Sequence, residues 1–118
     1  MPRVHRGFKA RRRRNKVLQL AKGFRGAKSR LYRTAVETVD RALVFAYRDR
    51  RNKKRDMRSL WIARISAGAE MNGTTYSRLI DGLHKASIEL DRKVLSHLAI
   101  VDPNGFSELV KTAVAARA

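Results

Sequence analysis

The sequence predicts an all-α fold, with a long basic helical extension at the N-terminus and a small helical globular domain after it. Only two prolines occur in the 118 residues, and no stretch alternates polar and apolar residues as a strand does. Charge is uneven, because residues 1–60 hold 21 basic and 4 acidic side chains whereas residues 61–118 hold 7 and 6. We predict the extension over residues 1–58 and the globular domain over residues 59–118.

The extension begins with a basic tail, MPRVHRGF, before a first helix predicted over residues 9–22. Val17, Leu18 and Ala21 give this helix a thin apolar edge. Gly23 can take the left-handed conformation that ends many helices, and GFRG supplies the turn.

A second helical pattern runs from about residue 29 to residue 71 and should end at Asn72-Gly73. A helix of about 43 residues extends roughly 65 Å, whereas a compact domain of about 60 residues is under roughly 30 Å across. The helix should therefore project beyond the domain or bend. Its main face is apolar, then cationic, then apolar again, and the cationic part consists of Arg50, Lys53 and Lys54.

The globular domain is predicted to contain three further helices, capped by Thr75, Asp91 and Asp102. Pro103 follows the third cap at the first helical position, where a missing N–H is tolerated. The expected core combines these helices with the end of the long helix, through Leu60, Trp61, Ile65, Tyr76, Leu79, Ile80, Leu83, Ala86, Val94, Leu95, Leu98, Ala99, Phe106, Leu109, Val110, Ala113 and Val114.

Composition excludes several classes of protein. No cysteine is present, and no apolar run approaches the roughly 20 residues that span a bilayer. The residues that suggest a catalytic triad are common types without a nucleophile elbow, and the three histidines lack metal-ligand spacing; the residues weighed are His84, Ser87, Asp91, Ser96 and His97. We expect no enzyme activity, cofactor, metal, small-molecule substrate or membrane contact.

The net charge of +18 indicates a polyanionic partner. Nothing apolar occurs from residue 48 to residue 56, so a helix there has no face to bury. A solvated helix with an Asp49–Lys53 ion pair is one explanation, but such pairs contribute only about 0.2–0.5 kcal/mol each. Phosphates on several sides explain the segment better. RNA is favoured because no major-groove reading motif is present, and a nucleoid-like, nonspecific DNA-binding protein is the alternative.

The aromatic side chains divide into two groups. Tyr32, Tyr47 and Trp61 lie on the helical stripe and are expected in a core. Phe8 and Phe24 lie in or near basic, glycine-flanked segments, so stacking on bases is a second hypothesis for these two rings.

Three segments resemble one family: LAKGFRGAKSRLYR (20–33), AYRDRRNKKRDMRSLWIARI (46–65) and YSRLIDGLHKASIELDRKVLSHLAI (76–100). They are similar to the bacterial-type large ribosomal subunit protein number twenty, over essentially the whole chain. The resemblance implies a non-enzymatic structural constituent of the large subunit. Its basic extension would be threaded into large-subunit rRNA and its helical domain would lie on the RNA surface.

The resemblance further implies binding near a helical junction of the rRNA early in assembly, beside neighbouring large-subunit ribosomal proteins. Some members also bind their own mRNA and repress its translation. A cytoplasmic ribosome is the simplest expected location, and an organellar ribosome stays open.

Carried over by position, the resemblance implies RNA contacts from the basic residues of the extension. They are Arg3, Arg6, Arg11, Arg12, Arg13, Arg14, Lys16, Lys22, Arg25, Lys28, Arg30, Arg33, Arg48, Arg50, Arg51, Lys53, Lys54, Arg55 and Arg58. Trp61 and Ile65 would anchor the extension to the domain. The sequence departs from relatives at Met57, Glu70 and His84, so positions 70 and 84 are left out of the expected contacts.

Overall fold

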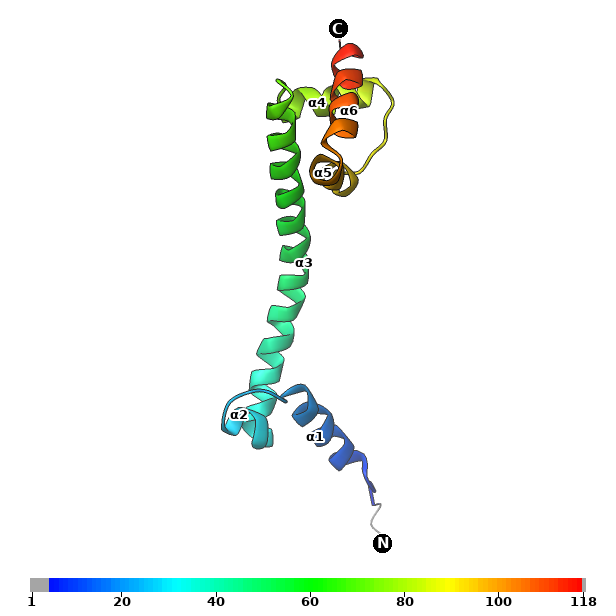
Figure 1. Cartoon of the computed structure of the whole chain (residues 1–118). Helices are drawn as coiled ribbons and strands as arrows, with labels where there is room; N and C mark the ends of the chain where they lie inside the picture. The colour runs from blue at the N-terminus through cyan, green and yellow to red at the C-terminus, as the bar shows by residue number, and fades with distance from the viewer. Residues whose placement is uncertain (1–4, 118) are drawn as a thin grey trace. The chain divides into compact units, whose positions relative to one another are not determined.

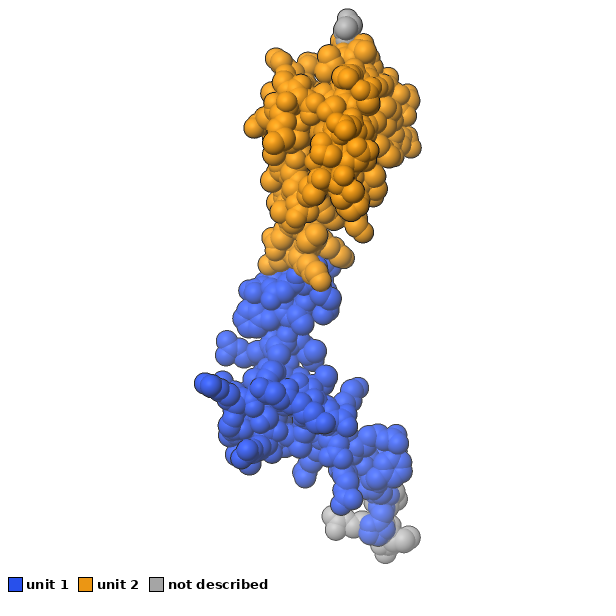
Figure 2. Space-filling view, in the orientation of Figure 1, with its two compact units in different colours: residues 1–51 blue, residues 52–118 orange. Residues whose placement is uncertain are grey.

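The structure is a computed structural model that describes residues 5–117. These residues form only helices, with no strand among them, which confirms the all-α fold class (Figure 1). The helices are α1 (Lys9–Leu20), α2 (Ala27–Arg30), α3 (Tyr32–Met71), α4 (Tyr76–Lys85), α5 (Arg92–Val101) and α6 (Pro103–Ala115). The chain divides into two compact units, residues 1–51 and residues 52–118 (Figure 2). The boundary predicted after residue 58 stays a prediction.

The long helix begins later than predicted. Residue 29 lies in the short helix α2, and Leu31 then has extended backbone angles, φ −94° and ψ 120°, so α3 starts at Tyr32. From there α3 is one uninterrupted helix to Met71. Its end at the Asn72-Gly73 pair is confirmed, because Gly73 has a φ of +72°.

A small hydrophobic cluster organises the first unit. Ala21, Ala35 and Val39 are buried, so the apolar edge that ends α1 packs against the first turns of α3. Gly23 makes the turn between them with a φ of +90°, as its position after α1 predicts. The partly buried residues around this cluster are Val17, Leu18 and Phe24.

The three caps predicted for the second unit are all present. The Thr75 side chain accepts a hydrogen bond from the backbone N–H of Arg78 at 3.5 Å. Asp91 and Asp102 accept from backbone N–H groups three residues further on, at 2.7 and 2.9 Å. Each cap satisfies a backbone donor that the first turn of a helix leaves without a partner.

The second unit has one core, which matches the prediction in most positions and departs from it in several. It consists of Ile65, Ala69, Leu79, Leu83, Leu95, Phe106, Val110 and Ala113, with Tyr76, Ile80, Ile88, Leu98, Ala99 and Leu109 partly buried against it. Leu60, Val94 and Val114 are exposed, and Trp61 and Ala86 are partly buried outside this cluster. These predictions were wrong because helical spacing identifies a face of a helix but not how far a neighbouring helix covers it.

Helices α4 and α6 approach each other most closely at Gly82. A Cβ atom at this position would lie 2.7 Å from the carbonyl carbon and 2.9 Å from the Cβ of Ala113. Glycine inside a helix usually costs about 1 kcal/mol relative to alanine. Because Gly82 has no side chain, the backbones of α4 and α6 can pack against each other. This close contact explains why a residue of low helix propensity occurs inside α4.

Gly82→Ala is therefore expected to destabilise the protein. Overpacking costs about 1–3 kcal/mol. The upper part of this range applies here, because the nearest obstructing atoms are backbone and cannot rotate away, and it exceeds the gain of about 1 kcal/mol in helix propensity. Denaturant unfolding followed by circular dichroism measures the change. Ser77→Ala, at an exposed position of the same helix, is the matched control. Equal or higher stability of the Gly82 variant would show that the α4–α6 contact can relax.

Helix α4 ends in a left-handed turn at a residue other than glycine. Ser87 has a φ of +55°, and its N–H donates to the carbonyl oxygen of His84 at 3.1 Å. The next N–H, of Ile88, donates to the carbonyl oxygen of Leu83 at 3.0 Å, and the Ile88 side chain packs against the core. This is a Schellman motif, in which glycine is the least strained residue at the left-handed position.

Ser87→Gly should consequently stabilise the protein by about 0.5–1 kcal/mol, because relief of left-handed strain outweighs the added freedom of the unfolded chain. The midpoint of thermal unfolding should rise by a few degrees. Ser77→Gly, inside α4, should lower it, which separates the conformational effect from any general effect of glycine. A lower midpoint for the Ser87 variant would contradict the argument.

Candidate nucleic-acid interface

The predicted RNA-binding residues are solvent-exposed throughout the described part of the chain. Arg3 lies outside the described residues, and every other candidate is exposed. The candidates from Arg6 to Arg33 lie on α1, on α2, in the turns beside them and at the start of α3. Those from Arg48 to Arg58 all lie on α3, some in the first unit and some in the second.

Almost none of these cations is neutralised inside the protein. Within residues 5–117 the four ion pairs involve only one candidate, Arg48, whose Nε lies 2.8 Å from Oδ1 of Asp49. The Asp49–Lys53 pair of the alternative, solvated-helix explanation is not formed, and Asp49 instead pairs with the residue before it. Both side chains of the observed pair are more than half exposed, so the pair contributes little to stability.

The middle of α3 has no hydrophobic support. The buried cluster of the first unit ends at Val39 and that of the second begins at Ile65, and no residue from 40 to 64 is buried. Fixing a backbone costs about 1–2 kcal/mol per residue in conformational entropy. Isolated helices are marginal in water even with favourable sequences. The segment that carries the densest positive charge is thus the one that most needs an external partner.

The aromatic residues differ from expectation in part. Tyr47, predicted in a core, is 56% exposed, whereas Tyr32 and Trp61 are partly buried. Phe8 is 64% exposed, which leaves its ring accessible for stacking. Phe24 packs against the buried cluster of the first unit, which argues against stacking on a base.

Ile65 lies in the core as expected of an anchor. Trp61 does not belong to that core, so the structure does not support its predicted role as an anchor.

The residues weighed for catalysis or metal binding give no site. Asp91 acts as a helix cap, and within residues 5–117 no group of His, Asp or Glu side chains could hold a metal ion. None of the described helices combines the length and apolar character needed to cross a bilayer.

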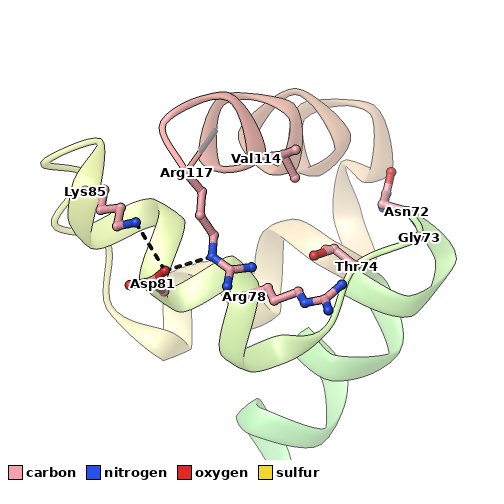
Figure 3. Close-up of a pocket in the computed structure, with 8 residues that line it drawn as sticks. All are labelled: Asn72, Gly73, Thr74, Arg78, Asp81, Lys85, Val114 and Arg117. Atoms are coloured by element: carbon pink, nitrogen blue, oxygen red, sulfur yellow. Dashed lines mark hydrogen bonds and ion pairs between the residues drawn. The ribbon is translucent and has the colours of Figure 1, made fainter.

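A polar pocket of about 570 Å³ lies in the second unit (Figure 3). Its lining includes Asp81, whose Oδ2 accepts a hydrogen bond from Nε of Arg117 at 2.9 Å and lies 3.8 Å from Nζ of Lys85. Arg78 also lines the pocket, so three cations line it with one carboxylate and the site retains net positive charge. Such a pocket can accept an anion such as a phosphate group.

This pocket was not predicted from the sequence. Arg78, Asp81 and Lys85 are spaced at i, i+3 and i+7 on α4, a pattern that places them on one helix face and could have been noticed. Arg117 follows α6, far along the chain, and only the fold brings it to Asp81.

Taken together, a helical fold and a run of exposed, largely unpaired cations are typical of proteins that bind a polyanion through a basic extension. Comparison with known proteins identifies the family: the model for "Ribosomal protein L20" matches residues 3–109. The chain belongs to this ribosomal protein family, which confirms the resemblance of the three segments. It is therefore a structural ribosomal protein and not an enzyme.

Close relatives cover nearly the whole chain. The chain is 66% identical over 113 residues to "Large ribosomal subunit protein bL20" of Geobacter metallireducens, covering 96% of this chain and 97% of the relative. It is 68% identical over 111 residues to the protein of the same name from Desulfatibacillum aliphaticivorans, covering 94% and 96%. The corresponding protein of Desulfotalea psychrophila is 68% identical over 109 residues, covering 92% of each chain.

Proposed function

We propose that this protein is a component of the large ribosomal subunit that binds large-subunit rRNA directly and organises it during early assembly. One observation carries the proposal: no residue from 40 to 64 of α3 is buried, although this segment holds exposed cations. The proposed contacts are the basic residues of α1, α2 and α3 named above, Arg3 included. The names of the relatives support a place in the large subunit.

Counterion release supplies the binding free energy. Each cation that meets a phosphate displaces condensed ions, and many such contacts add together. The extension would then be ordered fully only on RNA, because it cannot bury enough apolar surface by itself. Once ordered, it fixes the RNA helices around it in one arrangement.

The proposed partners are the rRNA near a helical junction, neighbouring large-subunit ribosomal proteins and the chain's own mRNA, in a cytoplasmic ribosome. The polar pocket of the second unit supports the mRNA proposal only through its net positive charge, which suits a phosphate group. The alternative is a nucleoid-like, nonspecific DNA-binding protein, which the density of positive charge alone would also allow.

The test of the proposed function is a binding series over increasing salt. It compares a large-subunit rRNA fragment that spans the junction with duplex DNA carrying the same number of phosphates. We expect RNA binding to persist at salt concentrations that abolish DNA binding, because positioned contacts add to the general electrostatic term. Equal affinities and equal salt slopes would instead favour the nucleoid-like alternative.

The same assay tests the role of individual cations on α3. Lys54→Ala should weaken binding to the RNA fragment and make the salt dependence shallower by under one unit of slope, because one phosphate contact is lost. Lys93→Ala removes a lysine of α5 that is also exposed but lies outside the extension, and should leave the slope unchanged. Identical slopes for the two variants and the wild type would contradict an RNA-embedded extension.

A further inference from the structure

Residues 43–47, LVFAY, form an exposed, apolar stretch of helix α3 in the first unit. The four large side chains, Leu43, Val44, Phe45 and Tyr47, are 53%, 69%, 44% and 56% exposed. They lie beyond Val39, where the buried cluster of this unit ends. Nothing in the first unit's own packing therefore accounts for two exposed aromatic rings beside the cationic segment.

An arginine from the next helical turn lies over each of these two rings. The Cζ atom of Arg48 lies 4.6 Å from the ring centroid of Phe45, and that of Arg51 lies 4.7 Å from the centroid of Tyr47. Nη2 of Arg51 also donates a hydrogen bond to the Tyr47 hydroxyl at 2.6 Å. Contact with a ring restrains a long side chain before any ligand arrives, so less rotamer freedom is lost on binding.

The two arginines differ in how much of their positive charge and how many of their N–H donors remain available to a ligand. Arg48 is already paired with Asp49. Arg51 has no carboxylate partner within residues 5–117, and it uses one of its five N–H donors on Tyr47. The pair of Tyr47 and Arg51 thus combines exposed planar groups with a full positive charge and free donors.

We propose that Tyr47 and Arg51 form a stacking site for one unpaired nucleobase of the RNA. The base would lie against the exposed planar surface of the pair, and the free N–H groups of Arg51 would reach an adjacent phosphate or base edge. A phosphate alone would leave the ring in water, whereas a base covers it. Unpaired RNA bases are commonly recognised by stacking on aromatic rings and on guanidinium planes.

The inference rests on the proposed RNA-binding function and names residues that give it selectivity for unpaired bases. The test uses the full-length protein, the junction-spanning rRNA fragment and a fully paired RNA duplex with the same number of phosphates. Tyr47→Leu and Arg51→Lys should each weaken binding to the fragment by about tenfold. Neither should change the salt slope, because the charge is kept in both variants, and neither should weaken binding to the duplex.

Two matched variants separate stacking from other effects. Tyr47→Phe keeps the ring and should keep affinity for the fragment within about twofold of the wild type. Arg64→Lys makes the same change at an exposed arginine of α3 that lies outside the proposed contacts and covers no ring among the described residues, and should also have little effect. Far-UV circular dichroism of each variant checks that helix content is unchanged.

Three results would overturn the proposal. Equal losses on the duplex would show that the ring only positions Arg51 for a phosphate. Unchanged affinity in Arg51→Lys would show that charge alone matters. Full affinity in both principal variants would leave residues 43–47 as a surface for a protein partner instead.

A direct signal keeps this inference separable from the proposed function. The chain has one tryptophan, so Tyr47→Trp combined with Trp61→Phe places the only tryptophan at the site, where it can be excited at wavelengths that tyrosine does not absorb. A single-stranded oligoribonucleotide should quench its emission, whereas the duplex should not. Loss of junction preference in the wild type with this quenching retained would overturn only the proposed function, and absence of quenching would overturn the stacking site.

Discussion

The physical constraint behind this protein is the lack of any buried side chain in the middle of α3. From residue 40 to residue 64 the helix has neither a core to pack against nor enough carboxylates to balance its cations. Positive charges spaced three or four residues apart repel one another on a helix. The segment must therefore gain its order from outside, and a dense array of phosphates removes the repulsion and supplies the missing contacts together.

The second unit, in contrast, is stabilised by contacts among its own residues. Its helices begin at side-chain caps, and Gly82 lets two helix backbones approach closely. Tyr76 accepts a hydrogen bond from Nε of Arg92 at 2.8 Å, which joins α4 to α5. A core of this size is only marginally stable, so these small contributions matter more than they would in a larger domain.

The accuracy of the sequence predictions follows the range of the interactions involved. The caps at Thr75, Asp91 and Asp102 were predicted correctly because each depends on a backbone N–H only three residues away. Tyr47 was misplaced because helical periodicity cannot tell whether a second element covers the face it defines. The pairing of Asp81 with Arg117 joins residues 36 positions apart, so no local pattern could have predicted it.

An arginine held over an exposed ring can give the extension both affinity and selectivity for RNA. A flexible cation binds phosphate anywhere, so charge alone gives affinity without selectivity. A guanidinium held by a ring has fewer orientations, and its plane can match a base as well as a phosphate. Arg12 lies over Phe8 in the same way, with its Cζ atom 4.7 Å from the ring centroid. The recurrence of this arrangement suggests that selectivity for folded RNA arises from where the cations are held, and not only from how many there are.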